Sequence, residues 1–353
     1  MRLTILLGLL FQTGAAQAQA PRDLPLDAAT RETLLTMVGQ RYDSLYAVPA
    51  VGRDLRQKIS EKQAMGGYAH CRTASCLSDV LTTDLQRWSG DKHLRLLFSV
   101  KPRPLQMETE DQVLARAAEL ENMRERNFGF HNIERLHGNV GLIEIGRFDP
   151  AADAAETAAA AMRFVANTDA LIIDLRNNGG GRADMVSHLM SYFVEEQTHL
   201  ATLRRRNPSD DAQLWTDAHV SAPPYLGKPV YVLTSARTFS GAEALTYTLR
   251  HFSAAKVVGE TTRGGANPGG IEQLSEHYAV FIPTARTINT KTGTNWDGVG
   301  ITPDHEVTAA DALKTAHRLA LQELLQKQAG APRARMWQQA MDEMFARKDL
   351  SAK

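Results

Sequence analysis

The chain has 353 residues, of which 43% are hydrophobic and 23% are charged. This composition is typical of globular proteins, and the length suffices for one large domain and a smaller one. The 40 basic and 40 acidic side chains cancel, so the net charge indicates neither a nucleic-acid partner nor an anionic membrane surface. No apolar run approaches the roughly 20 residues that span a bilayer.

The N-terminus has the three parts of a secretory signal peptide, namely a basic start, a short apolar run and a small-residue cleavage region. Cleavage after Ala18 is favoured over cleavage after Ala20, because a proline follows Ala20. We therefore predict a signal peptide over residues 1–18 and a mature chain that begins at Gln19 and is exported, either to the periplasm or out of the cell. A buried helix of the mature fold is the alternative interpretation.

Cys71 and Cys76 are the only cysteines of the chain. In an exported protein, two cysteines at short spacing favour a disulfide, provided that the residues between them turn. A metal site is less favoured, because His70 is the only other suitable ligand close by in the sequence.

Three stretches in the first third of the chain carry apolar residues at helical spacing. They are Leu34–Leu45, Val51–Ile59 and Leu77–Trp88. This pattern predicts a small helical domain over residues 19–92. His93 follows the third helix at its junction with a predicted strand, where a side chain can face a cleft, although a single histidine is more often structural.

After a polar segment with a predicted helix over 111–126, apolar runs alternate with helical patterns. The predicted strands cover 140–145, 170–175, 229–233, 256–258, 278–283 and 286–289, and the predicted helices cover 151–167, 185–194, a stretch after residue 240, and 309–328. The alternation indicates an α/β core over residues 93–328 with a parallel or mixed sheet. A charged helical tail is predicted over 329–353.

A glycine-rich segment, Arg176–Gly181, follows one of the buried strands. Consecutive glycines let backbone N–H groups approach a ligand closely. The segment does not match a phosphate-binding loop, because no Gly-Lys-Ser/Thr follows and the G-x-G-x-x-G spacing is absent. A purely structural turn remains the alternative.

Ser240 lies between an apolar strand and a helical pattern, which predicts a strand-to-helix turn. The free N–H groups of the first helical turn and the helix dipole favour negative charge there. Both an activated serine oxygen and an oxyanion would be stabilised. The simpler interpretation is that Ser240 only caps the helix.

Five segments, in this order, resemble the serine-protease family that includes the C-terminal-processing (tail-specific) proteases, the tricorn core protease and the interphotoreceptor retinoid-binding modules. The segments are Gly90–Leu96, Leu175–Gly180, Ser235–Ala244, Val258–Thr261 and Trp296–Asp304. The resemblance implies a crotonase-like β/α superhelix preceded by a helical domain.

The same resemblance implies that Ser240 is the nucleophile. The tail-specific proteases activate their serine with a lysine in a glycine-rich loop, but in this chain Gly265 holds that place. Neither Lys256 nor Lys291 falls there. A serine–lysine dyad is therefore not expected.

The tricorn-like branch instead uses a histidine and a glutamate, and this chain has His93 and the shorter Asp297 in those regions. Lys92 occupies the place of the second serine that the tricorn type has beside its histidine. We therefore predict a triad in which His93 accepts the proton of Ser240 and Asp297 orients the imidazole. Because an imidazole ionises near neutral pH, the rate is expected to rise through about pH 6–7.

The backbone N–H of Gly241, with one from Gly179 or Gly180, is predicted to hold the oxyanion. No cofactor or metal is implied. The favoured function is an exported serine peptidase that acts on a peptide or protein substrate, and the alternative is a non-catalytic module that binds an apolar ligand or a peptide, as in the retinoid-binding relatives. His93 and Asp297 distinguish the two, because a binding module needs neither a base nor an orienting acid.

Overall fold

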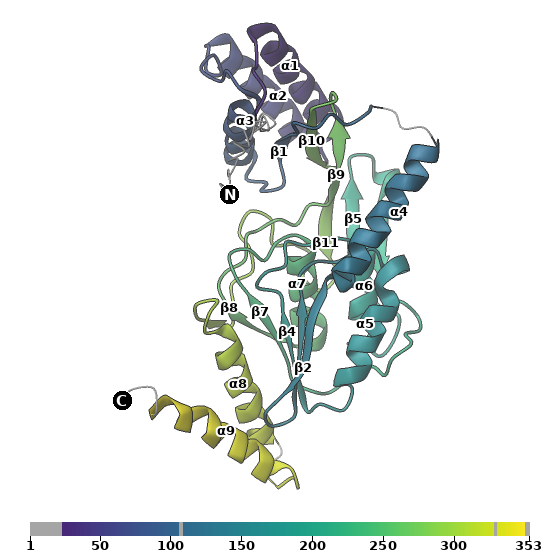
Figure 1. Cartoon of the computed structure of the whole chain (residues 1–353), viewed down its shortest axis with the longest axis vertical. Helices are drawn as coiled ribbons and strands as arrows, with labels where there is room; N and C mark the ends of the chain where they lie inside the picture. Colours follow the sequence, from purple (N-terminus) through teal and green to yellow (C-terminus); the bar gives the residue numbers. More distant parts are fainter. Residues whose placement is uncertain (1–22, 106–108, 328–329, 350–353) are drawn as a thin grey trace, which may run out of the picture.

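The structure, a computed structural model, describes residues 23–105, 109–327 and 330–349. Figure 1 shows an elongated molecule in which a helical unit at one end is joined to a larger α/β body. The predicted signal peptide over 1–18 lies outside the described residues and stays a prediction. Among the described helices, none has the length and apolar character that a membrane crossing requires.

The three predicted N-terminal helices are confirmed. They are α1 (Ala28–Leu45), α2 (Pro49–Ala64) and α3 (Ala74–Ser89). Asp27 caps α1 by accepting the backbone N–H of Thr30 at 2.7 Å. Gly90 ends α3 in a left-handed conformation, with φ at +78°. The chain reaches His93 directly after this turn.

A three-stranded antiparallel sheet ties the helical unit to the body. Its strands are β1 (Arg95–Phe98), β10 (Tyr278–Pro283) and β9 (Gly269–Gln273), in the order β1-β10-β9. Leu96 of β1 and Val280 of β10 are buried in the same apolar core as α1 to α3. The Tyr42 hydroxyl also donates to the carbonyl of Phe281 at 3.1 Å. The end of α3 is thus held against a strand from much later in the chain.

The central sheet has six strands in the order β12-β8-β7-β4-β3-β2. They are β12 (His305–Glu306), β8 (Lys256–Gly259), β7 (Val230–Thr234), β4 (Ala170–Asp174), β3 (Val140–Ile145) and β2 (Phe130–Leu136). All neighbours pair in parallel except β2, which is antiparallel to β3. Every residue of β4 and β7 is buried, which explains their continuous apolar runs.

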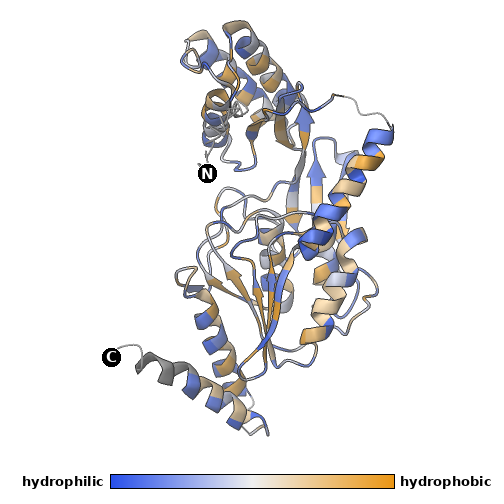
Figure 2. Ribbon diagram, in the orientation of Figure 1, coloured by the Kyte–Doolittle hydropathy of each residue, from blue (hydrophilic) through white to orange (hydrophobic). Residues whose placement is uncertain are grey.

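Alternate residues of a strand point to opposite faces of the sheet. Both faces of this sheet are apolar, so helices cover both. The helices are α5 (Ala151–Val165), α6 (Ala183–Met190) and α7 (Gly241–Ser253) on one face, and α8 (Ala312–Lys327) and α9 (Ala334–Asp349) on the other. Ile173 and Val232 pack with the first group, and Ile172 and Tyr231 pack with the second. Figure 2 shows the apolar strands between these helices. The mixed α/β fold with a helical N-terminal region is confirmed.

Five of the strands were not predicted: β9, β12 and three others. β2 and the pair β5 (His199–Arg205) and β6 (Ala212–Trp215) lie in segments without apolar runs, and β5 pairs with both β6 and β11 (Ala285–Asn289) in a third sheet. These strands are only partly buried, so their sequences lack the pattern of a buried strand. The predicted helix of the polar segment is present as α4 (Thr109–Glu125).

The parallel strands β4, β7 and β8 end at the same edge of the central sheet. The glycine-rich segment follows β4, the turn with Ser240 follows β7, and the loop with Gly265 follows β8. This edge of an α/β sheet is where ligands commonly bind. The fold therefore gathers three of the predicted site segments in one place.

Candidate active site

Ser240 and His93 are in contact in the structure. The Nε2 atom of His93 lies 3.0 Å from the Oγ atom of Ser240, although 147 positions separate the two residues in the chain. Ser240 stands at the start of α7, and His93 stands in the connection between α3 and β1. The contact has the distance that a base needs to accept the serine proton.

The backbone of Ser240 is held in a conformation that non-glycine residues rarely adopt, with φ at 54° and ψ at −117°. Such a conformation costs on the order of 1–3 kcal/mol and persists only where the surroundings enforce it. Gly180 packs directly behind it, because a Cβ atom at that glycine would lie 2.8 Å from the Cβ of Ser240. The turn presents the hydroxyl of Ser240, which is only partly buried, at the edge of the sheet.

Glu243 is a residue of the site that the sequence interpretation missed. Its carboxylate is fully buried and accepts the backbone N–H groups of Ser240 at 2.8 Å, Gly265 at 2.9 Å and Gly264 at 2.7 Å, as well as the hydroxyl of Thr262 at 2.5 Å. Burial raises the pKa of Glu243, while these four hydrogen bonds act in the opposite direction. A glutamate three residues after a helix-capping serine is the signal that could have revealed it.

The imidazole of His93 lies between two aromatic rings and is buried. Its centroid is 4.4 Å from that of Phe239 and 5.4 Å from that of Phe281. Gly265 packs against the same ring, because a Cβ atom there would lie 2.7 Å from Cε1 of His93 and 2.2 Å from Phe239. The place that a lysine holds in the tail-specific proteases therefore has no room for a side chain.

The two lysines considered from the sequence lie elsewhere. Lys256 forms an ion pair with Glu323 at 3.1 Å, and the Nζ of Lys291 lies 5.4 Å from the centroid of the Phe252 ring. Both line a cavity whose wall does not include Ser240. This arrangement supports a histidine, and not a lysine, as the base.

Two aspartates approach His93 on the side opposite the serine. One carboxylate oxygen of Asp91, one of Asp297 and a ring nitrogen of His93 all lie within 4.8 Å of one another. The nearer one is Asp91, whose Oδ1 lies 3.4 Å from Nδ1 of His93 without the alignment of a hydrogen bond. The amide of Asn267 donates to Asp91 at 3.2 Å and to Asp297 at 2.8 Å. The predicted acid Asp297 is thus present, and Asp91 is a second candidate.

The two carboxylates differ in their affinity for a proton. Burial, followed by the charge of Asp91, raises the pKa of Asp297 to about 6. Burial also acts on Asp91, but its contacts with the ring and backbone of His93 and with Asn267 outweigh it and lower the pKa. The Tyr46 hydroxyl donates a further hydrogen bond to Asp91 at 2.9 Å. Asp91 therefore stays ionised beside His93 at a lower pH than Asp297 does.

The predicted oxyanion donors lie around Ser240. Gly241 is the first residue of α7, so its N–H has no acceptor within the helix. Gly180 donates its N–H to the side chain of Asn178 at 2.7 Å, which leaves Gly179 as the better candidate of the two glycines. The assignment of Gly241 and Gly179 stays a prediction.

A cavity of about 70 Å³ opens beside Ser240. Its wall is mostly apolar and contains no ionisable side chain; it includes Val186, Leu200, Leu203, Leu214, Ala244, Ala266, Pro268 and Trp296. The sheet formed by β5, β6 and β11 supplies part of this wall. A site of this kind can accept an apolar side chain next to the nucleophile.

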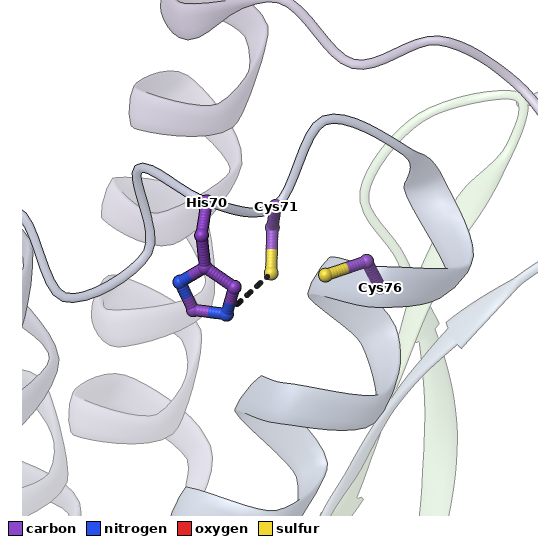
Figure 3. A group of neighbouring side chains, drawn as sticks. All are labelled: His70, Cys71 and Cys76. Carbon is purple, nitrogen blue, oxygen red and sulfur yellow. Dashed lines mark hydrogen bonds between the residues drawn. The ribbon is translucent and has the colours of Figure 1, made fainter.

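The two cysteines lie far from Ser240 in sequence and fold within the helical unit, as Figure 3 shows. Both are free thiols in this structure, and their sulfur atoms and a ring nitrogen of His70 all lie within 4.8 Å of one another. Burial and the neighbouring Cys76 raise the pKa of Cys71 to about 12. The two sulfur atoms lie close together, but they are not bonded in this structure. The Cys71–Cys76 disulfide therefore stays a prediction.

Comparison with known proteins decides the family. Residues 139–307 match peptidase family S41, and residues 26–128 match the N-terminal domain of Peptidase_S41 in eukaryotic IRBP. The chain belongs to peptidase family S41. The recognition made from the five sequence segments is confirmed.

Relatives within this family share limited identity with the chain. It is 27% identical over 166 residues to the chloroplastic carboxyl-terminal-processing peptidase 2 of Arabidopsis thaliana, which covers 47% of this chain and 31% of the relative. It is 28% identical over 180 residues to the carboxy-terminal-processing protease of Bartonella bacilliformis, which covers 48% of this chain and 39% of the relative. These matches thus span about a third of the length of the curated relatives.

A solved structure with the same fold is a lipoprotein from Streptococcus agalactiae. It has a TM-score of 0.52 and 14% sequence identity, and the match covers 85% of this chain and 99% of the lipoprotein. At this identity the likeness concerns the fold alone, and it extends over both the helical unit and the α/β body.

Proposed function

We propose that this member of family S41 is an exported serine peptidase that hydrolyses peptide bonds through Ser240, with His93 as the base. The observation that carries the proposal is the 3.0 Å contact between Nε2 of His93 and Oγ of Ser240. The strained turn at Ser240 supports it, because such strain is maintained mainly at functional sites.

The reaction follows from the positions of these groups. His93 accepts the hydroxyl proton while Oγ of Ser240 attacks the substrate carbonyl, and the N–H groups of Gly241 and Gly179 bind the resulting oxyanion. His93 then donates the proton to the leaving amine, and water repeats the sequence to release the acyl group. Asp297, together with Asp91, orients the imidazole and stabilises its charged form.

A non-catalytic module for an apolar ligand or a peptide is the second candidate. The apolar cavity beside Ser240 favours it. It gives no reason, however, for a buried histidine within hydrogen-bond distance of a strained serine, with two carboxylates behind the imidazole. The peptidase accounts for all of these features.

Substitution of the nucleophile tests the peptidase. Ser240→Ala should abolish hydrolysis of peptide substrates without unfolding the protein, because loss of a triad nucleophile typically costs ~10⁶ in kcat. Ser253→Ala is the matched control, since Ser253 lies at the other end of the same helix and donates only to the carbonyl of Leu249. Turnover by Ser240→Ala within tenfold of the wild type would show that the nucleophile is misassigned.

Export is part of the same proposal and has its own test. We infer that the signal peptide over 1–18 is removed and that the mature protein starts at Gln19. N-terminal sequencing of the protein from its native host measures this directly. Soluble cytoplasmic protein that starts at Met1 would contradict it.

A further inference from the structure

Three side chains of the kinds that commonly bind metal ions, those of His70, Cys71 and Cys76, lie together in the helical unit. Their two sulfur atoms and one ring nitrogen all lie within 4.8 Å of one another. Figure 3 shows the imidazole of His70 and the thiol of Cys76 on either side of Cys71. Thiolate and imidazole are ligands that Zn²⁺ and Cu⁺ prefer in proteins. The proposed peptidase reaction uses none of these side chains.

The spacing of these atoms agrees with that of ligands on one metal ion. Sγ of Cys71 lies 3.6 Å from Nε2 of His70. A Zn–S bond of about 2.3 Å and a Zn–N bond of about 2.0–2.1 Å, at a tetrahedral angle, also place sulfur and nitrogen about 3.6 Å apart. Two sulfur ligands of the same ion would lie about 3.8 Å apart. The two sulfur atoms lie within 4.8 Å of each other, so they need to move by no more than about 1 Å.

The backbone that carries the two cysteines is fixed by its own contacts. The N–H of Cys71 donates to the carbonyl of Tyr68 at 3.0 Å, and the carbonyl of Cys71 accepts a guanidinium N–H of Arg31 at 3.2 Å. Cys76 lies in the first turn of α3 and packs against the same apolar core as Cys71. Ligands that are held in place before an ion arrives bind it more tightly than mobile ones.

An ion can reach these side chains from solvent. Cys71 is buried, Cys76 is half-buried and His70 is exposed, so the imidazole forms the outer side of the group. Three ligands complete the coordination of Cu⁺, and they leave one tetrahedral position of Zn²⁺ for water on the exposed side.

A disulfide accounts for the two cysteines but not for the histidine. It joins only the two sulfur atoms, and it gives no reason for an imidazole nitrogen 3.6 Å from one of them. The disulfide and a bound ion would use the same sulfur atoms, so they are alternative states. The oxidised protein can form the first, and only the reduced protein can form the second.

We propose that the reduced protein binds one thiophilic metal ion, Zn²⁺ or Cu⁺, through Nε2 of His70 and the sulfur atoms of Cys71 and Cys76. The ion takes the place of the two thiol protons, which pass to solvent, and no oxidation state changes. The bound ion links the turn after α2 to the first turn of α3.

Metal titration of the untagged mature protein tests the proposal. The protein is reduced, freed of metal with a chelator and kept under nitrogen. Zn²⁺ and Cu⁺ are titrated in separate arms in competition with a chromophoric chelator, and Co²⁺ serves as an optical probe of thiolate ligands. The same titrations use His70→Gln, Cys76→Ser, the wild type oxidised to the disulfide, and His219→Gln as a control histidine that is likewise exposed.

The reduced wild type should bind one equivalent of at least one of the two ions with a Kd below ~1 µM, and the arm with the tighter binding identifies the ion. Co²⁺ should give a thiolate-to-metal charge-transfer band. His70→Gln should weaken binding by at least ~10²-fold and Cys76→Ser by at least ~10³-fold, because even the loss of a group that only supports a ligand costs ~10- to 100-fold. His219→Gln should bind as the wild type does, and the oxidised protein should bind neither ion.

The absence of binding in both arms of the reduced wild type would overturn the proposal. Binding that persists at wild-type affinity in His70→Gln, in Cys76→Ser or in the oxidised protein would also overturn it, because the ion would then lie elsewhere. A Co²⁺ complex without the charge-transfer band would exclude the thiolates as ligands. All of these results leave the proposed peptidase function untouched.

Discussion

Replacement of Glu243 by glutamine should lower activity although the side chain never touches the reacting atoms. The Glu243 carboxylate holds the N–H of Ser240 and the N–H groups of Gly264 and Gly265, whose loop backs onto His93. In the glutamine variant one oxygen becomes an NH₂ group. If the remaining oxygen stays with Ser240 and Gly265, the NH₂ group faces the N–H of Gly264, which loses its acceptor.

One buried N–H without a partner costs about 1–3 kcal/mol. For a domain of this size that corresponds to a loss of several degrees in Tm, so the protein should still fold. The effect on rate should be larger, because the same loop supports His93 and a displacement of the catalytic groups by about 1 Å can cost ~10². We expect Glu243→Gln to lower kcat by ~10- to 100-fold.

The assay is peptide hydrolysis together with thermal unfolding of the same samples. Glu260→Gln is the matched control. Glu260 lies directly after β8 and also accepts two backbone N–H groups, those of Ala236 and Ala309, but these contacts are not at His93. Its kcat should change little. A folded Glu243→Gln variant with kcat within twofold of the wild type and an unchanged Tm would refute the reasoning.

Three further predictions concern other parts of the molecule. Gly265→Ala should lower kcat by at least ~10²-fold, because the added Cβ would overlap the ring of Phe239 and the Cε1 atom of His93; steady-state kinetics at unchanged fold checks this, and wild-type turnover would contradict it. The folded pKa of Asp297, about 6, lies above its ordinary value of 3.8, so the stability associated with its proton is complete below about pH 4 and is lost as the pH rises through about 6. Thermal unfolding from pH 4 to pH 8 should therefore show the stability of the wild type falling relative to that of Asp297→Asn. If the stability of the two proteins changes equally with pH, the raised pKa is ruled out. In the activity assay, Asp297→Asn should lower the rate by up to ~10⁴. Oxidised protein should contain a Cys71–Cys76 disulfide worth about 2 kcal/mol, and two free thiols by intact mass in non-reduced protein from the native host would contradict it.

The main features of the fold could be predicted from the sequence because the buried strands are continuous apolar runs. β4 and β7 are buried throughout and were placed within a residue or so. β2 and β5 were missed, because β2 is mostly exposed and the end of β5 is arginine-rich. Their place in a sheet depends on pairing with distant strands, and local pattern does not contain that information.

The site was predictable to a similar extent. The position of Ser240 follows from a strand-to-helix turn, and that of His93 follows from a helix end, so both have local signals. Which carboxylate approaches the imidazole depends on how the helical unit packs against the α/β body. Asp91 lies only two residues before His93, yet its role became visible only when the structure placed it 3.4 Å from Nδ1.

Covalent labelling by a fluorophosphonate tests the central claim most directly, because it reports whether the serine is activated without requiring knowledge of the substrate. The account predicts a single adduct on Ser240 in the wild type, located by peptide mapping, and labelling of His93→Ala that is slower by at least ~10²-fold. An adduct on another residue, or labelling of His93→Ala at the wild-type rate, would contradict a nucleophile at Ser240 that is activated by His93.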